Sequence, residues 1–128
     1  MKTIYFLIIS GFIVIFFFFR GTPPEQGTQT ITGFYTDSVR MVIDKKCYGC
    51  HSVKGKSQKA KDKLMWDSLP GLPKSKIVAT LDDMIDVLDE DKMPPEELLK
   101  KYPDAKLLPL EKETLMKWAV SRSDSLLK

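Results

Sequence analysis

Both cysteines of the chain and its only histidine stand together in the five residues Cys47-Tyr48-Gly49-Cys50-His51. On one helical turn, residues i, i+3 and i+4 share a face, so two thiols and an imidazole would point the same way. This C-x-x-C-H spacing is the attachment signature of c-type haem. The thiols bond to two vinyl groups of one porphyrin, the imidazole binds the iron, and a glycine leaves room for the macrocycle. The sequence therefore predicts one covalent haem c on Cys47 and Cys50, with His51 as an axial iron ligand.

Other kinds of site use the same residue types. A thiol–disulfide oxidoreductase would carry its C-x-x-C at the start of a helix that follows a strand, and no strand pattern precedes Cys47. A structural zinc site needs four ligands, and the chain has no third cysteine and no second histidine. A disulfide that closes so short a loop would stabilise little. A dithiol oxidoreductase that uses Cys47 and Cys50 is kept as a third hypothesis.

The second axial ligand of the iron cannot be a histidine of this chain, which leaves Met, Lys, Tyr, a water or an open position. Beyond the N-terminal apolar segment, the chain has five methionines: Met41, Met65, Met84, Met93 and Met116. Met93 differs from the others because Pro94 takes it out of helical geometry and Pro95 stiffens the same loop. We therefore expect Met93 to be the second axial ligand, with Met65 as the alternative. For Met84 we expect core packing, and for Met116 core or partly exposed packing.

The N-terminus contains a long apolar segment. Residues 3–19 carry no charge and lie between Lys2 and Arg20, and their length of 17 residues falls between a signal-peptide core and a membrane span. Bulky Phe19 and charged Arg20 stand where a signal peptidase needs small side chains. We expect residues 1–20 to be an uncleaved signal anchor, with a cleaved signal peptide as the alternative. Thioether attachment takes place outside the cytoplasm, so the anchor would hold the domain at the inner membrane, facing the periplasm or cell exterior. Cleavage would release it into the periplasm.

The remaining chain is long enough for one small domain. Residues 21–35 are rich in Gly, Pro, Thr and Gln, a composition typical of a flexible tether. Residues 36–128 would then form a single haem c-binding domain. No strand-like alternation and no repeat occurs in it, so we expect an all-α fold.

Local signals place the helices of that domain. A cap at Thr36, Asp37 or Ser38 would start a helix that runs toward the cysteines. The lysine-rich residues 54–63 would form a loop entering a short helix near Trp66. Further helices are predicted from Thr80 or Asp82, from Pro95 to just before Pro103, and from about Pro109 to Leu127. The helix predicted from Thr80 or Asp82 carries an apolar stripe at i, i+3, i+4 and i+7, formed by Leu81, Met84, Ile85 and Leu88.

Charge excludes some functions. Residues 21–128 hold 18 Lys and Arg against 17 Asp and Glu, so a nucleic-acid partner is not expected. No paired carboxylates, Ser/His/Asp set or phosphate-binding loop is present, so we expect an electron carrier and not an enzyme, with no small-molecule substrate. The charges are unevenly spread, however. Residues 45–63 hold seven lysines against Asp62, and residues 82–97 hold eight acids against Lys92. One of these patches could steer a redox partner toward the haem edge.

Four stretches of the sequence resemble a known family: Cys47 to His51, the K-M-P-P of Lys92 to Pro95, the Y-P-D-A-K-L of Tyr102 to Leu107, and Leu115 to Ala119. Over about residues 39–119 the chain resembles the small bacterial "haem-binding domain" proteins, single-haem relatives of the class I cytochromes c. The resemblance implies a cytochrome c-like bundle of four to five helices around one covalent haem, with His51 and Met93 as axial ligands. The chain departs from the family where lysines replace a Trp-Pro-Trp-like segment, and where Leu108-Pro109-Leu110 begins the last helix.

Together these features predict a membrane-tethered monohaem c-type cytochrome. It would carry single electrons outside the cytoplasm, to or from redox partner proteins or a membrane respiratory complex. The alternative is a haem-based ligand binder or sensor with a weak or open sixth position.

Overall fold

A computed structural model describes residues 33–128, and no strand occurs among them, so the all-α prediction is confirmed for this part of the chain. The elements in chain order are α2 (Asp37–Val42), the π-helix η3 (Ile43–Cys47), α3 (Tyr48–His51), α4 (Gln58–Lys63), the 3-10 turn η4 (Leu69–Gly71), α5 (Lys74–Asp89), α6 (Glu96–Lys101), the 3-10 turn η5 (Pro103–Ala105) and α7 (Pro109–Leu127). The expected anchor at 1–20 and nearly all of the expected tether at 21–35 lie outside the described residues. Between residues 33 and 128, none of the helices is both long and apolar enough to span a bilayer.

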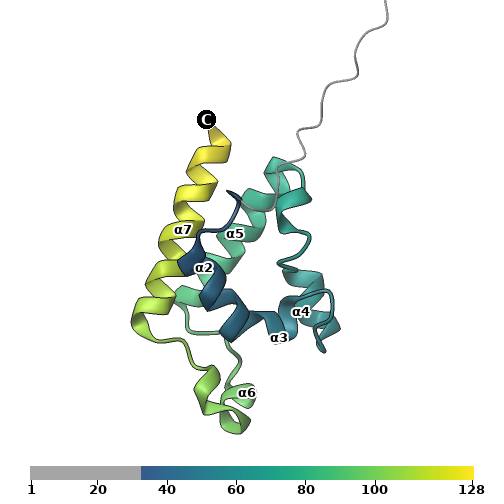
Figure 1. Cartoon of the computed structure of the whole chain (residues 1–128), viewed down its shortest axis with the longest axis vertical. Helices are drawn as coiled ribbons and strands as arrows, with labels where there is room; N and C mark the ends of the chain where they lie inside the picture. Colours follow the sequence, from purple (N-terminus) through teal and green to yellow (C-terminus); the bar gives the residue numbers. More distant parts are fainter. Residues whose placement is uncertain (1–32) are drawn as a thin grey trace, which may run out of the picture.

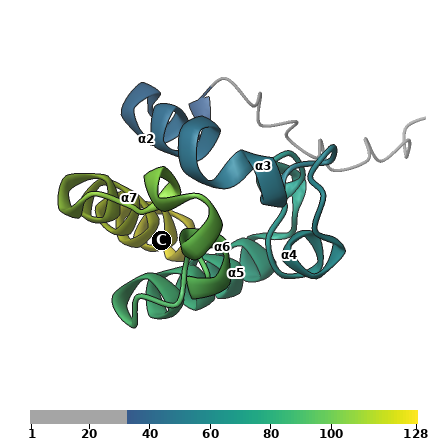
Figure 2. The same cartoon turned by 90° about the horizontal axis from the view of Figure 1, so that it is seen from below.

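The two longest helices, α5 and α7, pack along each other and form the centre of the molecule (Figure 1). Seen from below, α2 and α3 lie on one side and α5 on the other, with α6 at the near end (Figure 2). The buried face of α5 consists of Ile77, Leu81, Met84 and Leu88, and that of α7 includes Leu115, Trp118 and Ala119. Each large apolar side chain buried in this way contributes roughly 1.5–3 kcal/mol. The predicted stripe and the predicted apolar face of the last helix are therefore the core.

Helix α5 begins earlier than the sequence pattern predicted. Its first residue is Lys74, directly after the extended Pro73, and not Thr80 or Asp82. The reason is Ile77, which lies one turn before Leu81 on the same face and is 3% exposed. Burial of this side chain stabilises a first turn that otherwise carries only exposed polar residues.

The start of the folded domain is also earlier than expected. As predicted, Thr36 caps α2, and its hydroxyl accepts a hydrogen bond from the N–H of Val39. Phe34, however, is 2% exposed and belongs to the core. The indole N–H of Trp118 donates to its carbonyl at 3.2 Å. The core therefore begins at Phe34, inside the range predicted for the tether.

A short helix does occur between the motif and α5, but within the lysine-rich stretch and not near Trp66. This helix, α4, is capped by the Ser57 hydroxyl, which accepts from the N–H of Ala60 at 3.2 Å. Trp66 follows the helix in a turn and is 2% exposed. Its ring lies 6.0 Å from that of Tyr35 and 6.2 Å from that of Trp118, measured between centroids. This aromatic cluster anchors the α4 region to the main core.

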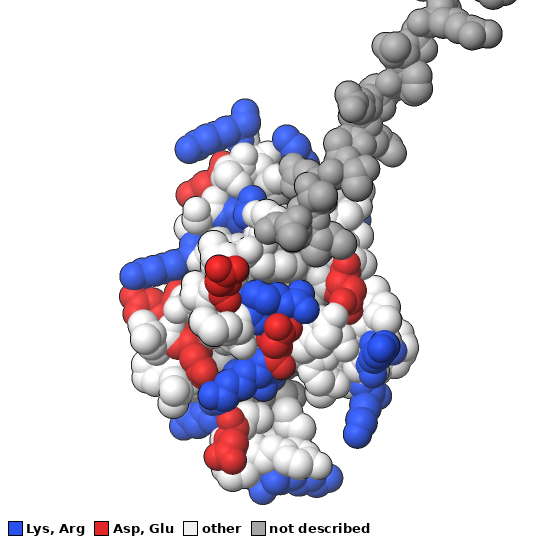
Figure 3. All heavy atoms as spheres, viewed as in Figure 1, with Lys and Arg blue, Asp and Glu red and all other residues white. Residues whose placement is uncertain are grey.

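Basic and acidic side chains alternate over the face shown in Figure 3, in line with the nearly balanced net charge. The α4 region differs from this pattern. Four of its lysines are exposed and form no ion pair with any described residue: Lys54, Lys56, Lys59 and Lys63. The single acid there, Asp62, accepts a hydrogen bond from the Gln58 amide at 2.7 Å. This stretch therefore presents unneutralised positive charge next to α3.

Candidate functional site

The C-x-x-C-H motif lies where helix geometry changes. The N–H of Tyr48 bonds to the carbonyl of Ile43, a wider turn than that of an α-helix, and α3 then carries the rest of the motif. Turns of this π type are frequent at functional sites. Cys47 ends the π-helix, while Cys50 and His51 lie on α3. The three predicted haem-binding residues thus lie in consecutive helical turns.

Both thiols are free and half-buried. Burial raises the pKa of Cys47 to about 12, and the nearby Glu111 carboxylate and Cys50 add to the shift, while Lys46 opposes it. Only the thiolate is a strong nucleophile. In the chain as folded, Cys47 is therefore protonated at neutral pH.

The imidazole of His51 has a defined tautomer. Its Nδ1 lies 2.8 Å from the carbonyl oxygen of Leu64. A carbonyl oxygen only accepts, so Nδ1 carries the proton and Nε2 of the neutral ring keeps its lone pair. Metal-binding histidines are commonly held by such a hydrogen bond from the nitrogen that does not bind the metal. His51 is therefore oriented as a ligand through Nε2.

The segment from Leu64 to Asp67 supports the motif at several points. The N–H of Trp66 donates to the carbonyl of His51 at 2.9 Å. The Asp67 carboxylate accepts from the Tyr48 hydroxyl and, at 2.7 Å, from the N–H of Val53. Burial by itself would raise the pKa of Asp67, but these hydrogen bonds outweigh it and lower the pKa. Neither Leu64 nor Asp67 was predictable from the sequence, because no local pattern indicates a contact with a motif 13 or 19 residues away.

A second glycine, which the motif does not include, closes the loop after His51. A Cβ atom on Gly55 would lie 2.3 Å from the carbonyl oxygen of Cys50, closer than any real contact. The N–H of Gly55 also donates to the Ser52 carbonyl at 2.8 Å. A Cβ on Gly49, by contrast, would meet no atom of the described chain within 4 Å. The tight backbone approach within the protein is therefore at Gly55, while Gly49 borders open space.

Met93 lies on the loop between α5 and α6, outside helical geometry as predicted. The end of α5 directs this loop. Asp91 has a φ of 53°, its N–H donates to Leu88 O at 3.1 Å, and the N–H of Lys92 donates to Val87 O at 2.8 Å. This is a Schellman ending with Asp where Gly is usual. The peptide bond after Met93 is cis.

The methionines differ in their surroundings. Met93 is half-buried and packs against the same core as Cys47. Met84 is 6% exposed within that core, as predicted, and Met41 is 67% exposed. Met65 and Met116 are half-buried. Exposure therefore sets Met41 and Met84 apart from Met93, but it does not separate Met93 from Met65.

Lys46, next to Cys47, ties the motif to the segment before α7. Its side chain is only 5% exposed. Its ammonium group donates to the carbonyl of Asp104 at 2.5 Å and to that of Lys106 at 2.9 Å. The Glu111 carboxylate lies 3.8 Å from the same nitrogen. The Y-P-D-A-K-L stretch is thereby fixed against η3 by a buried positive charge, a contact that the sequence did not indicate.

No protein-family model, curated protein or solved structure matches this chain. Within residues 33–128, no group of three or more His, Cys, Asp or Glu side chains is placed to hold a metal ion. A ready-made zinc site is therefore not found in this part of the chain. The donors that the motif does offer, two free thiols and an imidazole with a free Nε2, fit the needs of one haem c.

Proposed function

We propose that the chain is a membrane-tethered monohaem c-type cytochrome that carries single electrons outside the cytoplasm. Cys47 and Cys50 would bind haem c through thioether bonds, with His51 and Met93 as the axial ligands. Residues 1–20 would anchor the domain in the inner membrane, facing the periplasm or cell exterior. We further propose that it is a cytochrome c-like bundle of the "haem-binding domain" type and that its partners are redox proteins.

One observation carries this proposal: His51 donates from Nδ1 to the Leu64 carbonyl at 2.8 Å, beside two free thiols. The hydrogen bond presents the Nε2 lone pair for a metal and raises the basicity of the ring. A protein whose chemistry rested on the two thiols alone would have no need of this arrangement.

When bound, haem c supplies a one-electron Fe(III)/Fe(II) couple. The residues of the chain set its properties: a thioether at the second axial position favours ferrous iron compared with a second imidazole. With His51 and Met93 both bound to the iron, no position would remain open for a substrate. Both effects suit electron transfer.

The dithiol hypothesis is disfavoured by the raised pKa of Cys47. Thiol–disulfide oxidoreductases lower the pKa of their attacking cysteine, often at the start of a helix that follows a strand. Here burial raises that pKa to about 12. A helical segment precedes the motif, and residues 33–128 contain no strand.

Expression of the full chain in cells that attach haem c tests the proposal. Membranes should show a pyridine haemochrome spectrum, with the haem remaining on the polypeptide after denaturation. Cys50→Ala should abolish stable haem incorporation, because one thioether cannot hold the porphyrin in so small a domain. Replacement of the exposed Met41 by Ala should leave incorporation unchanged.

Recovery of normal amounts of holoprotein from Cys50→Ala would contradict the haem assignment. Addition of carbon monoxide then distinguishes the alternative function. A reduced wild-type spectrum that carbon monoxide leaves unchanged supports an electron carrier with two protein ligands. A spectrum that shifts indicates a ligand binder or sensor with an open sixth position.

A further inference from the structure

We propose that Asp67 is a positioning residue for the iron ligand His51. Together with Tyr48, it locks the C-x-x-C-H turn onto the segment from Leu64 to Asp67. This contact, here called the Asp67 clamp, would set the strength of the hydrogen bond from His51 to Leu64 and so the reduction potential of the iron. The inference rests on the proposed function.

The clamp spans the motif from both sides. One oxygen of the Asp67 carboxylate accepts from the Tyr48 hydroxyl, and the other accepts from the N–H of Val53 at 2.7 Å. Tyr48 precedes Cys50 and His51 in the chain, and Val53 follows them. A single carboxylate thus holds the chain on both sides of Cys50 and His51.

The segment that carries Asp67 also carries the partners of His51. Leu64 accepts from the imidazole Nδ1 at 2.8 Å, and the N–H of Trp66 donates to the His51 carbonyl at 2.9 Å. The segment itself has little freedom to move. Trp66 is 2% exposed, and its carbonyl accepts from the Tyr35 hydroxyl at 2.6 Å. The clamp therefore joins the motif to a fixed support and sets its distance from that support.

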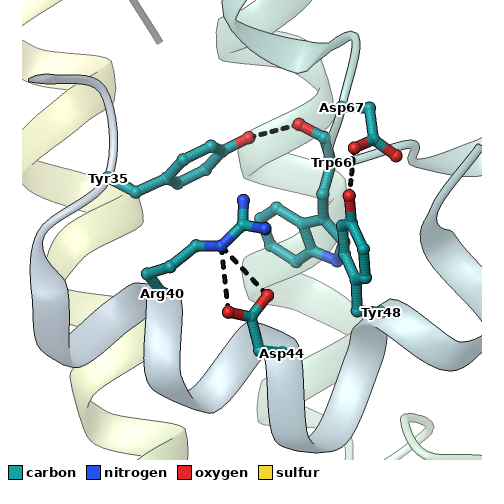
Figure 4. A network of polar contacts seen from close by, with 6 residues as sticks. All are labelled: Tyr35, Arg40, Asp44, Tyr48, Trp66 and Asp67. Carbon is teal, nitrogen blue, oxygen red and sulfur yellow. Dashed lines mark hydrogen bonds and ion pairs between the residues drawn. The ribbon is translucent and has the colours of Figure 1, made fainter. Parts of the chain in front are cut away.

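The ring of Tyr48 is held from a second direction (Figure 4). The guanidinium carbon of Arg40 lies 5.0 Å from the centroid of this ring, and Arg40 is itself paired with Asp44 at 3.0 Å. A cation over an aromatic face is attractive. With its ring against Arg40 and its hydroxyl on Asp67, Tyr48 has one preferred orientation, as a positioning device requires.

The effect of the clamp should appear at His51 more than in the stability of the fold. Asp67 is exposed, so water can replace its hydrogen bonds at little cost. The geometry of a ligating imidazole is more sensitive. A hydrogen bond from the nitrogen that does not bind the metal makes the imidazole a stronger electron donor, which favours ferric iron. Loosening the clamp should weaken that bond and raise the reduction potential.

The experiment compares three variants of the holoprotein. Asp67→Asn replaces one carboxylate oxygen by an NH2 group that can only donate, so the clamp keeps at most one of its two original bonds and loses the negative charge that strengthens both. Tyr48→Phe removes the hydroxyl and leaves the bond to Val53. Asp62→Asn is the matched control, because it removes the same charge from the same region but does not contact the motif. The measurements are the midpoint potential and the proton NMR signals of the His51 ring in the ferric protein.

We expect Asp67→Asn and Tyr48→Phe to raise the potential above that of Asp62→Asn and to shift the His51 signals. The double variant should go no further than the larger single change, since both substitutions disable one device. A potential and His51 signals equal to those of Asp62→Asn would overturn the inference. If Asp67→Asn yields no holoprotein, Tyr48→Phe alone decides by the same criteria. A wild-type chain that carries no haem would instead defeat the proposed function, so the two failures are distinguishable.

Discussion

At the scale of single residues, the fold favours a particular proton position on His51 and the protonated form of Cys47. His51 is held with its proton on Nδ1, so that Nε2 can bind a metal as the chain stands. Cys47 is held protonated by burial. The imidazole is thus prepared for its role, whereas the thiol is protected from side reactions. This combination suits a site in which sulfur serves for attachment and nitrogen binds the iron.

The protection of Cys47 predicts slow alkylation. Burial favours the neutral thiol, so the folded pKa of about 12 lies above the unfolded value of about 8.5. At a pH near the unfolded value, about half of Cys47 is thiolate in the unfolded chain, whereas nearly all of it is neutral thiol in the folded chain. In haem-free Cys50→Ser protein, iodoacetamide should therefore modify Cys47 far more slowly in native buffer than in urea. The rate is measured by mass spectrometry, and equal rates would show that Cys47 is not shielded.

That proton also links stability to pH. Because the pKa of Cys47 is higher in the folded than in the unfolded chain, the thiol contributes to the free energy of unfolding. This contribution is fully present below the unfolded pKa and is lost as pH rises toward the folded pKa. The urea midpoint of the same haem-free protein should fall between about pH 8 and pH 10. In a variant that also carries Cys47→Ser, the part of this decrease in the urea midpoint that comes from the Cys47 thiol should disappear.

The second axial ligand gives another prediction at this scale. Met93→Ala should remove the weak far-red absorption band of ferric haem with a thioether ligand. It should also lower the potential and open the iron to carbon monoxide. Met65→Ala is the matched comparison, since both methionines are half-buried. If only Met65→Ala has these effects, Met65 is the ligand.

At the scale of elements, two connections place the loops on either side of α6. The Schellman ending at Asp91 turns the chain toward Met93, and Lys112 of α7 binds the Asp91 carboxylate at 2.9 Å. Lys46 then fastens the segment after α6 against the motif. Helix α6 itself has only half-buried and exposed residues, so these ties do more to hold the region than its own packing.

Loss of the Lys46 tie should destabilise this region. Lys46→Met keeps the aliphatic stem but removes the donor from the two carbonyls, which should lower the free energy of unfolding by about 2 kcal/mol. Lys45→Met removes the same charge from an exposed neighbour and should change stability by less than about 0.5 kcal/mol. Urea unfolding of both holoproteins measures the difference. Equal midpoints would mean that the buried ammonium contributes no net stability.

At the scale of the whole molecule, opposite charges are separated along the chain. The α4 region carries lysines that form no ion pair within residues 33–128, whereas α5 exposes acids along its solvent side: Asp82, Asp83, Asp86 and Asp89. Such a distribution makes the surface of the α4 region locally positive, although the domain as a whole is nearly neutral. Transient electron-transfer complexes are small, and their association rates depend on such steering.

The lysines around α4 should therefore control association with a redox partner. Replacing Lys54, Lys56 and Lys59 by Glu should slow electron transfer with native membranes and leave the haem spectrum unchanged. Replacing three other exposed lysines, Lys74, Lys76 and Lys101, changes the net charge equally and should have a smaller effect. Raising salt from about 10 mM to about 150 mM shortens the Debye length from roughly 30 Å to roughly 8 Å and should slow the unmodified protein. If the rates respond to neither change, these lysines do not steer the partner and serve only to keep the surface solvated.

Much of the architecture was predictable because it depends on short-range patterns. The bounds of α7 follow from Pro109 and the apolar face around Trp118, and the start of α2 follows from the Thr36 cap. The three metal- and haem-binding candidates of the motif also come from spacing alone, since a helical turn brings i, i+3 and i+4 to one face. The sequence by itself thus determined the helical class and singled out Cys47, Cys50 and His51 as the candidate site residues.

Only the tertiary structure decided what surrounds the motif. The carbonyl of Leu64, the carboxylate of Asp67 and the burial of Lys46 involve partners 13 to 60 residues away in the chain. The same is true of Phe34, whose carbonyl binds Trp118 across the core. Every residue has a backbone carbonyl, so the residue type does not show which carbonyl will accept a hydrogen bond from the motif. In the same way, nothing in the sequence distinguishes Asp67 from the other exposed acids. Their roles exist only once packing of α5 against α7 brings distant segments to the motif, which no local propensity encodes.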